Sequence, residues 1–193
     1  MTEQVHSTLP LPGTKMTTEE FLALPETLTR IELIDGVVIY PFGYDEGNAM
    51  SPAPTAPHQN AVRNLFLVVN DLKKGDTWFT PLDVEFPDGS VLQPDVFWYS
   101  ENHKPDKSGK HIVDIPDLII EVLSPSSDNH DKNKKFHIYE KAGVAEYWLA
   151  DTRAETVDVW QLIDGEYQKL GTFRNNFHSP ILDAEIPVTG VFV

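Results

Sequence analysis

A chain of 193 residues can form one domain with a sizeable core, and its 40% hydrophobic and 23% charged residues are ordinary for a soluble globular protein. The absence of cysteine excludes disulfides, thiolate metal ligands and cysteine nucleophiles. No apolar run approaches the roughly 20 residues that cross a bilayer, and the polar N-terminal segment has no export pattern. We therefore expect a soluble cytoplasmic protein that makes no membrane contact.

The formal net charge of −15 is the unusual bulk property. A strongly acidic protein repels nucleic acid and anionic membranes at long range. The charge is unevenly distributed, because residues 104–141 contain seven lysines and seven acidic residues, while the rest of the chain carries the whole excess. An anionic substrate is therefore expected to approach residues 104–141.

The N-terminal part of the chain predicts an arm, a short helix and a hairpin. Residues 1–16 are predicted to form a flexible arm. Thr17 provides a hydroxyl cap for the helix that follows, which has acidic residues in its first turn. Two strands are expected within Arg30–Tyr40, joined by a tight turn at Asp35-Gly36.

The next segment predicts a long loop, a helix and a second hairpin. Residues 41–57 are rich in proline and glycine, and so long a loop in a compact domain is often functional. The apolar periodicity of His58–Lys74 predicts a helix that Gly75 ends. Residues 77–86 and 91–99 are expected to pair as a hairpin around a turn.

The C-terminal part predicts strands. A first strand is expected at Glu146–Asp151, followed by 156–163 and 167–173, which are joined at Asp164-Gly165. No repeat or linker divides the chain. The sequence predicts one mixed α/β domain over residues 17–193, built around a central sheet with flanking helices and N-terminal hairpin elements.

The segment from Asp117 to Gly143 is the most informative. Residues 118–123 form a nearly continuous apolar run, which is typical of a strand covered on both faces. Glu121 lies within this run, where an ionised carboxylate loses hydration and needs a cation, a metal ion or a strong donor as its partner.

A helix is expected after this strand, because Ser126, Ser127 and Asp128 are good N-caps and Gly143 suits a left-handed C-cap. At 100° per residue, Lys135 falls near the centre of the arc that faces the sheet. Lys135 is therefore expected near Glu121.

Asp95 supplies a second carboxylate beside an apolar strand, because it directly precedes the run Val-Phe-Trp-Tyr at 96–99. Carboxylates with water and phosphate oxygens suit Mg²⁺ or Mn²⁺, which lower the pKa of bound water. A lysine can orient that water or stabilise the charge of the transition state. Asp95, Glu121 and Lys135 thus predict metal-dependent phosphodiester hydrolysis.

The order of several motifs is similar to that of the Uma-type restriction endonuclease family, within the PD-(D/E)XK nuclease superfamily. The matching segments are Glu-Leu-Ile-Asp-Gly at 32–36, Met-Ser-Pro at 50–52, Pro-His-Gln at 57–59, Gln-Pro-Asp at 93–95, Glu-Val-Leu-Ser-Pro-Ser at 121–126, Asp131 and Lys135 before Tyr139, and Ala-Gly-Val-Ala-Glu-Tyr-Trp at 142–148.

This resemblance implies a restriction-endonuclease-like core and Mg²⁺- or Mn²⁺-dependent cleavage of DNA, carried out by a homodimer. It implies that Asp95, Glu121 and the Val122 carbonyl bind the metal ion. It also implies that Glu32 and His58 assist. The usual lysine two residues after the glutamate is replaced by Leu123, and its role is assigned to Lys135 on the helix.

Two departures from the family pattern are Ile31, where an aromatic residue is usual, and an apparent insertion at residues 41–49. The insertion leaves the substrate preference open.

Simpler interpretations exist for each of these residues. Glu121 is also consistent with a structural ion pair, Asp95 with a strand cap, and Lys135 with a side chain that extends to solvent. His58 and Glu32 are equally consistent with surface positions. For the whole protein, the alternatives are a binding or regulatory module with a degenerate nuclease site, which the net charge favours, and a metal-dependent hydrolase of another substrate.

Overall fold

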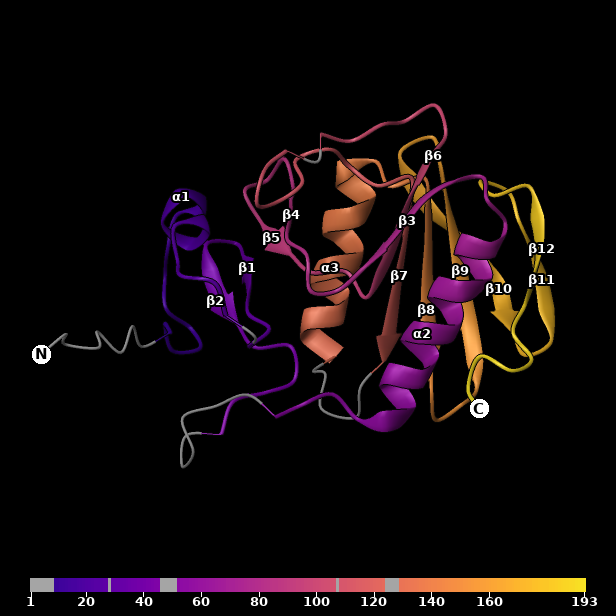
Figure 1. Cartoon of the computed structure of the whole chain (residues 1–193), viewed down its shortest axis with the longest axis horizontal. Helices are drawn as coiled ribbons and strands as arrows, with labels where there is room; N and C mark the ends of the chain where they lie inside the picture. Colours follow the sequence, from indigo (N-terminus) through magenta and orange to yellow (C-terminus); the bar gives the residue numbers. More distant parts are fainter. Residues whose placement is uncertain (1–8, 28, 46–51, 107, 124–128) are drawn as a thin grey trace, which may run out of the picture.

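A six-stranded mixed sheet forms the centre of the protein, as seen in a computed structural model that describes residues 9–27, 29–45, 52–106, 108–123 and 129–193 (Figure 1). Its strands lie in the order β10-β9-β8-β7-β6-β3. Their bounds are β3 Gly75–Phe79, β6 Val96–Ser100, β7 Leu118–Leu123, β8 Glu146–Asp151, β9 Thr156–Ile163 and β10 Glu166–Phe173. Adjacent strands are antiparallel except for β7 and β8.

The parallel pair β7 and β8 is joined by helix α3, Asn129–Ala142, which lies on one face of the sheet. Such a crossover is required because parallel neighbours cannot be joined by a tight turn. Gly143 follows the helix with a φ of 91°, and its N–H donates to the Tyr139 and Glu140 carbonyl oxygens. The predicted C-cap is thus confirmed. The predicted N-caps at 126–128 lie outside the described residues.

A smaller four-stranded antiparallel sheet packs beyond α3, in the order β2-β1-β5-β4 (Figure 1). Its strands are β1 Glu32–Ile34, β2 Val37–Ile39, β4 Val84–Glu85 and β5 Val91–Leu92. The predicted hairpin at Asp35-Gly36 is confirmed, with both turn residues at positive φ. The predicted central sheet with N-terminal hairpin elements is likewise confirmed.

The second predicted hairpin is divided between the two sheets. β4 pairs with β5 in the small sheet, whereas β3 pairs with β6 in the large sheet. Prolines interrupt both halves of this hairpin, at Pro81 and Pro94, and proline cannot donate to a strand ladder. The division places Asp95 at the seam between the sheets, immediately before β6.

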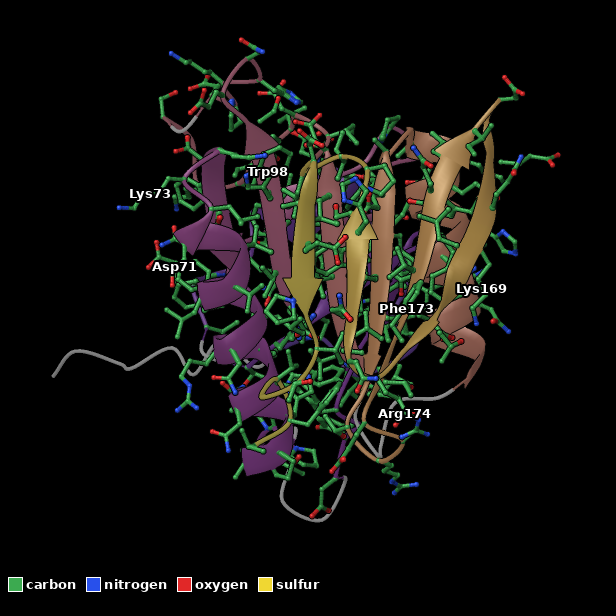
Figure 2. The ribbon with its side chains drawn as sticks, turned by 90° about the vertical axis from the view of Figure 1, so that its right-hand side faces the viewer. Asp71, Lys73, Trp98, Lys169, Phe173 and Arg174 are labelled. Carbon is green, nitrogen blue, oxygen red and sulfur yellow. The ribbon has the colours of Figure 1, made fainter. Side chains whose placement is uncertain are left out.

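Each face of the large sheet has its own apolar core. On one face, helix α2, Ala56–Asp71, and the hairpin of β11 Asn176–Ser179 and β12 Ala184–Pro187 cover residues such as Trp98 and Trp148 (Figure 2). On the other face, α3 and the small sheet enclose Phe97, Ile119 and Tyr147. Because β7 is covered on both faces, its side chains are apolar on both, apart from Glu121.

Helix boundaries differ from the predicted ones at α2. Thr55 caps the helix, which therefore begins before His58, and it ends at Asp71. Gly75 does not end this helix and instead begins β3. The short first helix is α1, Thr18–Leu22, with the predicted cap at Thr17 and a reciprocal bond from the Thr17 N–H to the Glu20 carboxylate.

The end of the predicted arm lies beside β2, because Lys15 bridges to Val37 and the Gly13 N–H donates to the Val38 carbonyl oxygen at 2.9 Å. The division into an arm at 1–16 and one domain at 17–193 stays a prediction. In the described part of the chain, none of the helices has the length and apolar character needed to cross a membrane.

Gly75 gives a test of the packing between β3 and β6. A Cβ at this position would lie 2.0 Å from the Tyr99 carbonyl oxygen, which is backbone and cannot rotate away. We expect Gly75→Ala to lower the free energy of unfolding by about 1–3 kcal/mol or more, measured by urea denaturation. Gly171→Ala is the control, because the atoms nearest to its Cβ would belong to the Phe173 side chain and not to the backbone. Equal losses in both variants would contradict this packing.

Candidate metal-dependent hydrolytic site

A cluster of buried ionisable side chains lies at the seam between the two sheets. It combines Glu32 of β1, His58 of α2, Asp95 before β6, Glu121 of β7 and Lys135 of α3. None of the five is more than 8% exposed. The structure therefore brings together all five side chains that the sequence singled out, although their chemical roles stay predictions.

Strand alternation explains why Glu121 faces this cluster. In β7, Ile120 and Val122 point into the core under α2, whereas Ile119 and Glu121 point to the face that α3 covers. The Tyr139 hydroxyl of α3 donates to Glu121 Oε1 at 2.6 Å, and Lys135 Nζ contacts the same oxygen at 3.1 Å. The helix thus supplies two donors to the carboxylate of the preceding strand.

Lys135 bridges two carboxylates. Its Nζ atom lies 2.8 Å from Glu32 Oε1 as well as 3.1 Å from Glu121 Oε1. Lys134, the next residue on the helix, instead lies 3.7 Å from the exposed Asp35 carboxylate. The predicted arc is therefore correct in placing Lys135 against the sheet, and extension of Lys135 to solvent is excluded by its burial.

Asp95 has donors on both carboxylate oxygens. Arg30 Nη1 donates to Oδ1 at 2.6 Å, while the Val122 N–H donates to Oδ2 at 2.8 Å. His58 Nε2 lies 3.3 Å from Oδ2. Val122 therefore contacts the site through its N–H, and the role of its carbonyl as a metal ligand stays a prediction.

Arg30 is the central residue that the sequence analysis missed. Its side chain is 9% exposed and contacts all three carboxylates, with Nη2 at 3.2 Å from Glu32 Oε1 and 3.8 Å from Glu121 Oε2. Nη2 also donates to the Gln93 carbonyl oxygen. The alternation of Arg30 and Glu32, two residues apart beside a strand, was the available signal that both side chains share one face.

The electrostatic environment shifts the pKa values of the two predicted metal ligands, Asp95 and Glu121, in opposite directions. Although burial opposes its charge, Asp95 has a pKa well below the usual range because of Arg30 and His58. Burial raises the pKa of Glu121, and Lys135 only partly offsets this effect. Burial also opposes the charges of Lys135 and Arg30, but the surrounding carboxylates outweigh it and raise both pKa values. Glu121 is thus the carboxylate that takes up a proton more readily.

A small cavity of about 50 Å³ adjoins the cluster. This volume holds a few water molecules or a partly hydrated ion, because one water needs about 10–15 Å³ on this measure. Its charged lining is the cluster itself with Arg30, and its apolar lining is Ile39, Pro41, Phe42, Val122, Leu123, Tyr147 and Leu149. The Phe42 ring packs edge-on against His58 and lies 5.4 Å from the Arg30 guanidinium carbon.

The donor chemistry fits a hard divalent cation. Carboxylate oxygens are the ligands that Mg²⁺ and Mn²⁺ prefer. Glu32 Oε2 is buried and has no hydrogen-bond partner in the described part of the chain, which leaves one oxygen available as a ligand. Within the described residues, however, no three acidic or histidine side chains are close enough together to hold a metal ion. A metal ion held by the two carboxylates of Asp95 and Glu121 would therefore be completed by water and substrate oxygens.

Lys135 offers a test of the charge balance. Lys135→Ala leaves Glu32 and Glu121 without their ammonium partner in a buried site, and we expect it to lower the free energy of unfolding by about 3–5 kcal/mol. Lys134→Ala, whose partner is exposed, is expected to cost about 0–1 kcal/mol. Urea denaturation at neutral pH measures both. Similar losses in the two variants would show that Lys135 does not balance these carboxylates.

Comparisons with known proteins agree on the kind of fold. Residues 18–189 match the Uma2 family, whose description is "Putative restriction endonuclease". A crystal structure from Anabaena variabilis, described as "a putative nuclease belonging to DUF820", has a TM-score of 0.71 and 23% sequence identity, over 92% of this chain and 97% of that chain. No curated protein shows significant similarity to the chain. The match over nearly the whole sequence shows that this chain belongs to the Uma2 family.

Proposed function

We propose that this protein is a divalent-metal-dependent DNA endonuclease. The observation that carries the proposal is the burial of Asp95, Glu121 and Lys135 together beside a cavity at the seam of the two sheets. Membership of the Uma2 family, described as "Putative restriction endonuclease", supports a nuclease. The Anabaena variabilis protein of similar fold is likewise described as "a putative nuclease".

In this proposal Asp95 and Glu121 would hold a Mg²⁺ or Mn²⁺ ion, which when bound would lower the pKa of a water molecule and offset negative charge on the phosphate. Lys135 orients that water or stabilises the negative charge that builds up on the phosphate. Glu32 fixes Lys135 through the 2.8 Å contact, and Tyr139 fixes Glu121. His58 assists by contacting Asp95, with Nε2 at 3.3 Å from Oδ2.

DNA binding must overcome the net charge of −15. The neutral balance of residues 104–141, together with the bound metal ion, reduces the repulsion locally. We therefore expect DNA binding that is weak without divalent metal and strongly dependent on it. The homodimer and the cytoplasmic location stay predictions.

A second function is favoured by Arg30. Its guanidinium occupies the space among the three carboxylates, where a metal ion would bind. This is expected of a protein that keeps the nuclease fold, has lost catalysis and acts as a binding or regulatory module. The strongly acidic net charge also favours such a module.

Plasmid cleavage distinguishes the two functions. We expect the wild-type protein to nick or linearise supercoiled plasmid with Mg²⁺ or Mn²⁺, and not with EDTA. Asp95→Asn and Glu121→Gln should abolish cleavage, because each removes a metal ligand while keeping a similar shape. Lys135→Ala, assayed well below its unfolding temperature, should reduce turnover by roughly 10²–10³.

Lys134→Ala is the matched control for these variants, because Lys134 is adjacent on the helix and its ion pair is with the exposed Asp35 and not with the cluster. It should cleave like the wild type. Equal cleavage by Lys134→Ala and Lys135→Ala would remove Lys135 from the mechanism. A folded wild-type protein that cleaves no DNA with either metal would favour the binding module.

A further inference from the structure

We propose that Arg30 is the internal cation of this centre, and that Arg30 and a divalent metal ion compete for the carboxylates of Asp95 and Glu121. The inference rests on the proposed metal site and concerns a residue that has no role in the mechanism above. It assigns Arg30 the function of holding the metal-free site together and setting its affinity for metal.

The contacts of Arg30 are those of a cation at the centre of a ligand set. Nη1 lies 2.6 Å from Asp95 Oδ1, and Nη2 lies 3.2 Å from Glu32 Oε1 and 3.8 Å from Glu121 Oε2. The carboxylates come from distant parts of the chain, and among the described residues Arg30 is the one side chain that forms ion pairs with all three. A metal ion bound by Asp95 and Glu121 would need oxygens that Arg30 now contacts.

The charges lead to the same conclusion. Three carboxylates face two cations, Arg30 and Lys135, in a site that is almost fully buried. Addition of a divalent ion beside both cations would place several positive charges within a few ångströms in a medium of low dielectric constant. Displacement of the guanidinium removes this repulsion. Lys135 can stay in place, because it keeps its ion pair with Glu32 even if Glu121 binds the metal ion.

The surroundings of Arg30 leave its guanidinium room to move. Arg30 borders the cavity, and the Phe42 ring, 5.4 Å from its Cζ atom, lines the same cavity and attracts a cation through its face. Arg30 Nε has no hydrogen-bond partner among the described residues, so the side chain is not fixed at this atom. Rotation about the side-chain bonds would release Asp95 Oδ1 and Glu121 Oε2 together.

The test compares Mn²⁺ affinity, measured by calorimetry and by the loss of the free Mn²⁺ paramagnetic resonance signal. We expect Arg30→Gln to bind Mn²⁺ more tightly than the wild type, on the order of tenfold or more, because a competing charge is removed. Arg30→Lys should lie between the two. Arg63→Gln is the control, because Arg63 is exposed on α2, where its Nε donates to the Asn64 side-chain oxygen, and it takes no part in the cluster. Arg30→Gln combined with Asp95→Asn should lose the gain.

Unchanged or weaker Mn²⁺ binding by Arg30→Gln would overturn the proposal, because Arg30 would then merely hold the ligands in place. If Arg30→Gln does not fold without metal, we expect Mn²⁺ in the refolding buffer to restore its folding, because the ion takes the place of the guanidinium. Failure of millimolar Mn²⁺ to restore folding would also overturn the proposal. In the wild type, Mg²⁺ should shift the nuclear magnetic resonance signals of the Arg30 guanidinium. Saturating Mg²⁺ without such a shift would contradict the competition.

These outcomes are separable from failure of the proposed function. Tighter Mn²⁺ binding by Arg30→Gln in a protein that cleaves no DNA would support the competition and reject the nuclease. Metal-dependent cleavage by the wild type, with no gain in affinity in Arg30→Gln, would support the nuclease and reject the competition.

Discussion

The burial of three carboxylates at one seam of the fold is the constraint on which the rest of the structure depends. Glu32, Asp95 and Glu121 are nearly inaccessible to solvent, and burial of unpaired anions would cost several kcal/mol each. Arg30 and Lys135 meet this cost by contacting more than one carboxylate apiece. The buried cluster therefore links both sheets with α3. Any charged ligand that enters it changes the ion pairs of several residues at once.

The topology explains how these charges meet. The divided hairpin sends β4 and β5 to the small sheet and β3 and β6 to the large one, so Asp95 lies where the two sheets separate. The β7–α3–β8 crossover places α3 over Glu121, with Lys135 and Tyr139 one helical turn apart on its inner face. Two cations, Arg30 and Lys135, are in this way placed among the three buried carboxylates.

The central part of the site was predictable because its signals are local. An apolar run containing Glu121, followed by a helix with Lys135 on its sheet-facing arc, gave the correct strand, helix and contact. The divided hairpin was not predictable from alternation, because β4 and β5 continue the pattern of β3 and β6 and only the prolines mark the break. The role of Gly75 was likewise not predictable, because a glycine after an apolar helix fits both a helix end and the start of a strand that packs closely on its neighbour. Arg30 was missed because its partners Asp95 and Glu121 are 65 and 91 positions away in the sequence.

The central claim is that this buried cluster is a divalent-metal site, and crystals grown with saturating Mn²⁺ test it most directly. The account predicts an anomalous scattering peak that contacts the carboxylates of Asp95 and Glu121, with the Arg30 guanidinium moved away from Asp95. Manganese bound elsewhere, or absent from the cluster while the Arg30–Asp95 pair stays intact, would contradict the account.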